Sequence, residues 1–149
     1  MNSARFEAVP NLSEGRNPIV LERCAHAIAQ HARLVHQTSD PVHHRSVFTY
    51  FGDEEEIFAA TLALAKVALE EIDLRLHRGA HPRIGALDVL PIVPLGDTTM
   101  AEAAALAHRI GAALWSELGL PVFFYGEAAL QPTRRLLADV RRGEYEGLV

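Results

Sequence analysis

The chain has 149 residues, 49% of them hydrophobic, and carries 14 basic against 19 acidic residues for a formal charge of -5. This length suits a single domain over residues 1–149, and the basic residues form no cluster that could follow a phosphate backbone, which argues against a nucleic-acid partner. The lone Cys24 excludes an internal disulfide and a cysteine-built zinc site, and no segment has the roughly 20 apolar residues of a membrane span, so we expect a cytoplasmic protein without a membrane partner.

The first strand and the first helix are predicted close to the N-terminus. Phe6 to Pro10 has the short apolar pattern of a strand, and a polar turn follows it. Between Pro18 and Ala32 the apolar residues recur at helical spacing, with Asn17 as a candidate N-cap and Pro18 suited to the first turn. We therefore expect a strand followed by a helix.

The next stretch is predicted to hold two strands and a long helix. Leu34 to Gln37 alternates apolar with polar residues, Asp40-Pro41 interrupts the pattern, and Arg45 to Phe51 alternates again. Asp53 is a candidate N-cap, and three glutamates follow it in the first turn, where the helix dipole favours negative charge. A broad apolar stripe runs on to about Ile72, which indicates a helix lying against a sheet.

The second half begins with a loop. His77 to Gly85 contains too much glycine and proline for a helix or a central strand. The patterns after it predict a strand, an alanine-rich helix, a further strand and a short helix, at Leu87 to Pro94, Thr98 to Leu118, Pro121 to Tyr125 and Pro132 to Arg141.

This order predicts an α+β fold of the ferredoxin-like, split β-α-β type, with an added strand and helices. Helices would cover one face of a mostly antiparallel sheet. Several strands are apolar on both sides, which indicates that another copy or another chain covers the second face. The residues behind this inference are Val47, Tyr50, Val89, Ile92 and Phe123.

The loop around His81 is the first candidate site. Histidine titrates near neutrality and is the commonest general acid or base. Gly79 and Gly85 bracket His81, Pro82 stiffens the backbone after it, and Arg83 places a cation nearby, so the loop can hold one imidazole while a ligand approaches. A tight turn with an incidental histidine explains the same residues equally well.

The turn between the two middle strands is the second candidate site. It gathers five polar side chains, Asp40, His43, His44, Arg45 and Ser46. Arg45 can grip a carboxylate through two hydrogen bonds. The alternative is a surface hairpin with an ion pair between Asp40 and Arg45.

Three further features of the sequence bear on the kind of site to expect. Gly126-Glu127 follows a predicted strand, where the carboxylate can orient a histidine or bind a ligand nitrogen, or is merely an acid at a helix start. The histidines 43, 44, 77 and 81 match no compact metal-binding motif, so we expect no metal. A phosphate-binding glycine motif is missing, which argues against a nucleotide site.

Five sequence blocks in order resemble the N-terminal subdomain of the glutamate formiminotransferase family. The blocks are VPNLSEGRN (9–17), DPVHHRSVFTYFG (40–52), HRGAHPRIGALDVLPIVP (77–94), VFFYGEAA (122–129) and RRGEYEGL (141–148). Five ordered blocks are a far more specific signal than any one of them. Two positions depart from the family pattern: Ala80 stands where many members have Glu, and His44 where Asn is common.

The resemblance implies a ferredoxin-like fold, tetrahydrofolate as co-substrate and N-formimino-glutamate as donor. It implies that His81 is catalytic, since one group near neutral pKa can act first as base and then as acid. It also implies that the hairpin residues Asp40, His43, His44 and Arg45 line the site with Arg83, that Arg45 or Arg83 holds a carboxylate, and that Gly126 and Glu127 meet the ligand.

Two functions follow from this resemblance, and a third from the histidines. The first is a folate-dependent formiminotransferase, or a subunit of one, that pairs with itself as a homo-oligomer or with a separate second-subdomain chain. The second is a non-catalytic folate-binding or regulatory module without that second subdomain. A metal-dependent hydrolase built on the histidines is the weakest of the three.

Overall fold

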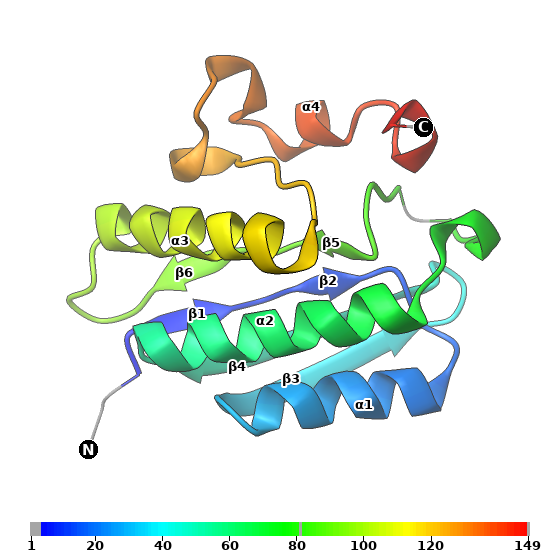
Figure 1. Cartoon of the computed structure of the whole chain (residues 1–149), viewed down its shortest axis with the longest axis horizontal. Helices are drawn as coiled ribbons and strands as arrows, with labels where there is room; N and C mark the ends of the chain where they lie inside the picture. Colours follow the sequence, from blue (N-terminus) through cyan, green and yellow to red (C-terminus); the bar gives the residue numbers. More distant parts are fainter. Residues whose placement is uncertain (1–3, 81, 149) are drawn as a thin grey trace.

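The computed structural model describes residues 4–80 and 82–148, which form an α+β fold with one sheet and three long helices. Helices α1, α2 and α3 lie side by side on the same face of the sheet (Figure 1). Their bounds are Pro18–Ala29, Glu54–Glu71 and Met100–Leu118. No helix within these described residues is both long and apolar enough to cross a membrane.

The sheet is antiparallel and follows the ferredoxin-like order. Strands β1 and β2 form one row that pairs with β4 on one side and with β6 and β5 on the other, while β3 pairs with the free side of β4. The bounds are β1 Phe6–Ala8, β2 Asn11–Leu12, β3 Arg33–Asp40, β4 Arg45–Gly52, β5 Leu87–Val89 and β6 Ile92–Pro94. The predicted split β-α-β fold is therefore confirmed.

Each long helix begins where a polar side chain satisfies its first free amide groups. Asn17 accepts hydrogen bonds from the amides of Ile19 and Val20 at the start of α1, as predicted. Asp53 and Thr99 each form a capping box with a glutamate three residues later, at the starts of α2 and α3. Gly119, in the left-handed conformation, ends α3.

The core lies between the helices and one face of the sheet. Phe48 and Tyr50 of β4 point toward the helices and are fully buried, and the Tyr50 hydroxyl pairs with the Thr61 hydroxyl of α2 at 2.6 Å. The alternate residues of β4, Val47, Thr49 and Phe51, face the other way and remain partly exposed. No element among the described residues covers this second face, which we call the open face.

The predicted strand Pro121–Tyr125 is wrong. This segment pairs with no strand in the described part of the chain, and its Phe124 side chain packs on α3 instead. Phe124 lies so close to Gly111 that a methyl group there would be 2.5 Å from the ring, and His108 contacts the same ring edge-on at 4.7 Å. A tertiary contact with the helix replaces the expected pairing.

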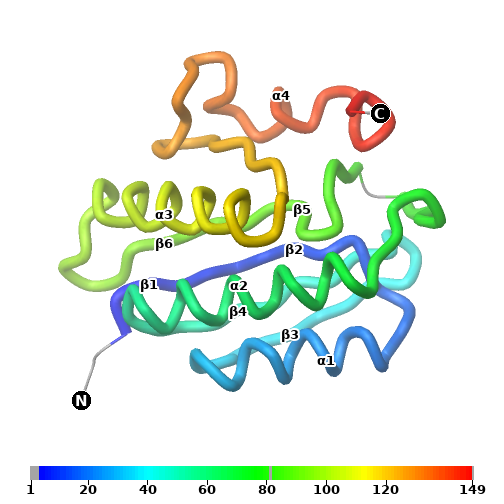
Figure 2. Tube along the Cα trace, viewed as in Figure 1, coloured from blue at the N-terminus to red at the C-terminus, as the bar shows by residue number. Residues whose placement is uncertain are grey.

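The C-terminal segment, residues 120–148, runs over α3 in short irregular pieces (Figure 2). The helix predicted over Pro132–Arg141 is present only in two pieces, the 3-10 turn η3 (Pro132–Arg134) and helix α4 (Leu137–Arg141). The remaining 3-10 turns in the described part of the chain are η1 (Leu74–Leu76), η2 (Gly126–Ala128) and η4 (Tyr145–Leu148).

Candidate functional site

Three connecting segments meet at one end of the sheet (Figure 1). They are the turn after β2, the hairpin loop between β3 and β4, and the loop before β5, at residues 13–16, 40–45 and 77–85. The Ser13 hydroxyl donates to the carbonyl oxygen of Gly85 at 2.8 Å, and the Ala80 amide donates to that of Val42 at 3.3 Å. These bonds join all three segments, as the candidate site requires.

Two glycines allow this close approach. A Cβ atom on Gly15 would lie 2.3 Å from the carbonyl oxygen of Asp40, and one on Gly79 would lie 2.3 Å from that of His43. Backbone atoms occupy the space that any other side chain would need. The 77–85 loop and the 13–16 turn therefore depend on glycine where each meets the hairpin.

His81 lies outside the described residues, so its catalytic role remains a prediction. The described residues on either side of it belong to the packed 77–85 loop. Among the residues that the structure describes, no three histidine, cysteine or carboxylate side chains are grouped to hold a metal ion.

Two imidazoles stack where the hairpin meets the 77–85 loop. The rings of His44 and His77 lie 4.4 Å apart and are inclined by 11°. The Nε atom of Arg83 can only donate, so it fixes Nδ1 of His77 as an acceptor at 3.1 Å, and Nε2 of His77 then donates to the His44 carbonyl oxygen at 3.0 Å. These two hydrogen bonds fix the orientation of the His77 ring.

His44 has an unusual backbone and a shifted pKa. Its φ is 54°, in the left-handed region that asparagine also adopts readily, which explains how either residue fits this position. Burial lowers the pKa of His44, with Glu14 opposing this effect and His77 adding to it. Its Nδ1 accepts from the Gly15 amide at 3.0 Å, so the ring is suited to the neutral form.

Asp40 forms its hydrogen bonds within its own hairpin loop. Its carboxylate lies 2.7 Å from Nδ1 of His43 and also accepts from the amides of Val42 and His43. Hydrogen bonds from the His43 amide and ring lower the pKa of Asp40. The suggested ion pair between Asp40 and Arg45 does not form, although the two residues are opposite each other in the sheet.

Arg45 instead binds a buried carboxylate of β5. Its NH1 group donates to Asp88 at 2.8 Å, and Arg141, the last residue of α4, donates to the same oxygen at 2.9 Å. Burial raises the pKa of Asp88, but hydrogen bonds from the Ile84 amide, Arg45 and the Gly85 amide outweigh burial, so the net pKa is lowered. We call Arg45, Asp88 and Arg141 the arginine pair cluster.

Arg83 joins the 77–85 loop to the C-terminal segment. Its guanidinium donates to both carboxylate oxygens of Glu146, at 2.7 and 2.8 Å, and to Glu144 at 3.3 Å. The hydrogen bonds from Arg83 lower the pKa of Glu146 to about 2. In this conformation the donors of Arg83 are engaged within the protein.

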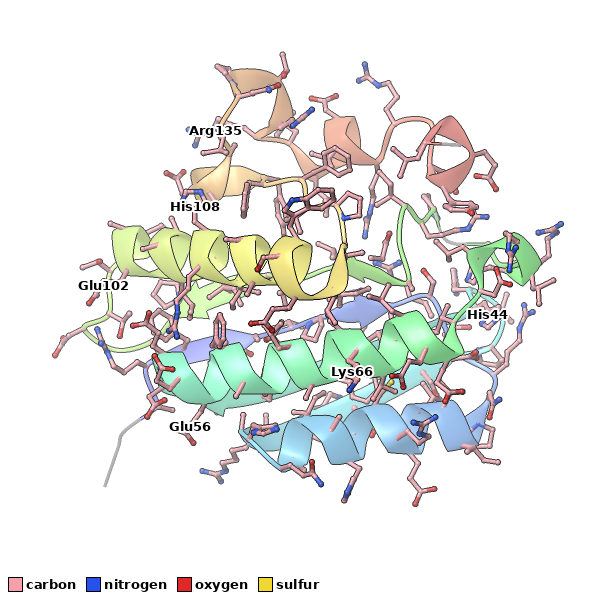
Figure 3. The ribbon with its side chains drawn as sticks, viewed as in Figure 1. His44, Glu56, Lys66, Glu102, His108 and Arg135 are labelled. Carbon is pink, nitrogen blue, oxygen red and sulfur yellow. The ribbon has the colours of Figure 1, made fainter. Side chains whose placement is uncertain are left out.

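Gly126 and Glu127 lie apart from the hairpin. They belong to η2, which packs on α3, and Glu127 pairs with Arg135 at 2.6 Å. Figure 3 shows Arg135 and His108 far from His44, toward the opposite end of α3. The structure therefore groups the hairpin with the 77–85 loop but does not bring Gly126 and Glu127 to them.

A largely apolar cleft of about 1000 Å³ separates the C-terminal segment from α3 and β5. Asp88 and Tyr125 lie in its wall, and so do Gly126 and Glu127. Burial raises the pKa of the Tyr125 hydroxyl, which keeps it protonated, while the charge of Arg141 opposes the shift. The cleft thus extends from Gly85 of the 77–85 loop to Gly126 and Glu127, which the sequence predicts as separate candidate sites.

Sequence reasoning missed Asp88 and Arg141. One signal was present, because a carboxylate inside the otherwise apolar strand Leu87–Val89 needs a buried partner. Nothing in the sequence paired Asp88 with Arg141, which lies 53 residues further along the chain.

Comparison with known proteins agrees with this arrangement. The family described as "Formiminotransferase domain, N-terminal subdomain" matches residues 5–149. The formimidoyltransferase-cyclodeaminase of Gallus gallus is 44% identical over 95% of this chain and 27% of its own length. The glutamate formimidoyltransferases of Streptococcus pyogenes serotype M1 and Thermoplasma acidophilum are 41% and 43% identical, over 95% and 94% of this chain.

The chain spans less than half the length of these relatives, 48% of the Streptococcus protein and 47% of the Thermoplasma protein. The similarity nevertheless covers the sheet, the helices and all three segments of the site. The chain therefore belongs to the formiminotransferase family, as its N-terminal subdomain.

Proposed function

We propose that this chain supplies one half of a glutamate formiminotransferase, which moves a formimino group from N-formimino-glutamate to tetrahydrofolate. The observation that carries the proposal is the meeting of the hairpin with the 77–85 loop at one end of the sheet, in a chain of this family. Tetrahydrofolate is a co-substrate, and no metal takes part in the proposed reaction.

The chemistry needs one group that both accepts and donates a proton. N5 of tetrahydrofolate attacks the formimino carbon and forms a new carbon–nitrogen bond. The bond from that carbon to the glutamate nitrogen then breaks. In the proposed mechanism His81 takes the proton from N5 and gives it to the departing glutamate nitrogen, so the enzyme ends in its starting protonation state.

The anchoring of the 77–85 loop supports this role. A histidine that exchanges protons with a ligand must keep a fixed geometry. Ala80, before it, is bonded to the hairpin, and Arg83, after it, is bonded to His77 and Glu146. Both flanks of position 81 are thus held by described contacts.

The proposed binding residues divide into two groups. Asp40, His43, His44 and Arg45 form the first group with Arg83, around the hairpin and the 77–85 loop. Gly126 and Glu127 form the second. The cleft wall includes Gly85 of the 77–85 loop as well as Gly126 and Glu127, so a long ligand such as a folate can extend from the second group to that loop.

The open face supports the need for a second half. Val47, Thr49 and Phe51 of β4 remain partly exposed on a face that no described element covers. We propose that the second subdomain of the enzyme, or a second copy of this chain, packs there. The cytoplasm is the expected compartment for such an enzyme.

A reconstitution assay tests the proposed function. The chain, mixed with the C-terminal half of a related enzyme, should form 5-formiminotetrahydrofolate from the two substrates, which is measured by its absorbance. His81→Ala should abolish the reaction. His31→Ala changes an exposed histidine between α1 and the start of β3, at the end of that strand opposite the hairpin, and should leave the reaction intact. An active His81→Ala protein would refute the mechanism.

A non-catalytic folate-binding module is the second candidate, favoured by Ala80 at a position where many family members have Glu. Calorimetric titration with a reduced folate separates the two functions. Binding without turnover in every pairing would favour the module. If the reduced folate bound in none of the pairings, the folate-binding module would be rejected.

A further inference from the structure

The arginine pair cluster carries more positive than negative charge. The Asp88 side chain is fully buried, and one of its oxygens accepts from both arginines while the other accepts from the amides of Ile84 and Gly85. All the favourable positions around the carboxylate are therefore filled. Two guanidinium groups share a single negative charge.

The neighbouring carboxylates do not balance the excess. Asp40 faces Arg45 across the sheet, but its oxygens bind His43 and the amide of Val42. Glu144 and Glu146 bind Arg83. These three carboxylates are thus each bound to a partner outside the cluster.

One donor of the cluster is buried and has nothing to bind. The Nε–H group of Arg141 lies out of contact with solvent and has no hydrogen-bond partner among the described residues. A buried donor without an acceptor costs free energy, more so on a charged group. Such a donor is well suited to a ligand that brings an acceptor and a negative charge.

The cluster also lies at the edge of the open face. Arg45 shares its side of β4 with Val47 and Thr49, because alternate residues of a strand point the same way. Its Nε donates to Asn11, which is opposite Val47 in the sheet. A ligand between the open face and a second subdomain would therefore meet Arg45 at the end of β4.

We propose that Arg45 and Arg141, held apart by Asp88, bind a carboxylate of the formimino-glutamate donor. The inference rests on the proposed function for the identity of the ligand. Guanidinium groups bind carboxylates through paired, charge-assisted hydrogen bonds. Because Asp88 already holds both guanidinium groups in place, little side-chain entropy is lost when a ligand binds them. Arg141 thereby becomes a specificity residue, at the start of the block RRGEYEGL, to which the resemblance assigned no role.

The experiment observes the two side chains directly. The arginine Nε–H signals of the ¹⁵N-labelled chain are recorded by NMR during titration with glutarate, a dicarboxylate without the formimino group, and with N-formimino-glutamate. We expect the signals of Arg45 and Arg141 to shift with both compounds. Glutaramide, which has the same carbon skeleton but no charge, should shift neither signal.

Variants separate binding from folding. Arg141→Gln should weaken the glutarate response of the Arg45 signal by about tenfold or more, while Arg141→Lys, which keeps the charge, should weaken it less. Arg142→Gln changes the exposed neighbour, which pairs with Asp139, and should leave binding unchanged. Thermal unfolding of each variant shows whether it is folded.

The outcomes distinguish this inference from the proposed function. If neither arginine signal responds to either dicarboxylate, or if Arg141→Gln binds as tightly as the parent chain, the inference is wrong whatever the transfer assay shows. If the arginine signals respond but reconstituted enzyme transfers no formimino group, the carboxylate site stands and the proposed function fails.

Discussion

Asp88 organises the site at the level of single residues. It bonds Arg45 of β4, Arg141 of α4 and two amides of the 77–85 loop, so it connects three parts of the chain. Its charge compensates the buried cation of Arg45 and the partly exposed cation of Arg141. Removing that charge should therefore cost more than removing an ordinary surface carboxylate.

The Asp88→Asn variant tests this role. An asparagine keeps the shape but leaves both guanidinium groups uncompensated, so the free energy of unfolding should fall by about 3–5 kcal/mol, as for other broken buried ion pairs. Urea unfolding measures the change. Asp97→Asn alters an exposed aspartate between β6 and α3 and should stay within about 0.5 kcal/mol of the parent. If the two variants changed the free energy of unfolding equally, Asp88 would stabilise the fold no more than an exposed aspartate does.

Gly79 provides a second test at a single position. In Gly79→Ala the new methyl group would lie 2.3 Å from the His43 carbonyl oxygen, so the 77–85 loop must move away from the hairpin at a cost of about 1–3 kcal/mol. The amide hydrogen of Ala80, bonded to Val42, should exchange faster with solvent. Gly147→Ala has open space around it and should change neither stability nor exchange. Unchanged exchange at Ala80 would mean that the contact does not hold the loop.

At the scale of whole elements, sequence reasoning succeeded where the determinants are local. Asn17 and Asp53 cap α1 and α2 as predicted, because a cap and the amides it binds lie within a few residues of each other. The segment Pro121–Tyr125 has the composition of a strand, yet Phe124 packs on Gly111 of α3. That choice depends on tertiary packing, which local propensity does not contain.

The candidate site divides in the same way. The hairpin and the 77–85 loop were found because their unusual residues are adjacent in sequence. The link from Arg83 to Glu146 spans 63 residues and the link from Asp88 to Arg141 spans 53, so neither has a local signature. His81 was singled out from the sequence, and its role remains a prediction.

The contact of Arg83 with Glu146 ties the C-terminal segment to the loop in a pH-dependent way. The pKa of Glu146 is lowered from its ordinary value of 4.5 to about 2. Because the folded-state pKa is the lower one, the stabilisation from this pair is present above pH 4.5 and is lost as the pH falls toward about 2. The carboxyl carbon of Glu146 should titrate by NMR with a midpoint near 2.

Two variants check the cause of this shift. Arg83→Gln removes the guanidinium that binds Glu146, so the midpoint should return toward the ordinary value of 4.5. Arg78→Gln removes a weaker influence on the same carboxylate and should leave most of the shift in place. If both variants moved the midpoint equally, long-range charge rather than the hydrogen bonds would be responsible.

At the scale of the whole molecule, helices cover only one face of the sheet among the described residues. Three helices bury the inner residues of the sheet, whereas β3 is exposed along almost its whole length and β4 presents Val47, Thr49 and Phe51 to the open face. The arginine pair cluster and the hairpin lie at one end of that face. A partner that covered the face would bury its apolar side chains and enclose the site in one step.

Thr49→Arg tests this arrangement. Thr49 lies between Val47 and Phe51 on the open face and is opposite His36 of β3, so a long cation there should obstruct any body that packs on the sheet. Sedimentation velocity of the chain mixed with the second subdomain should show the complex lost or weakened by at least about tenfold. Ser116→Arg places the same side chain on the exposed surface of α3, away from the open face, and should leave association intact. A Thr49→Arg protein that associates normally and keeps its transferase activity would show that the partner packs elsewhere, and the open face would then have no part in enclosing the site.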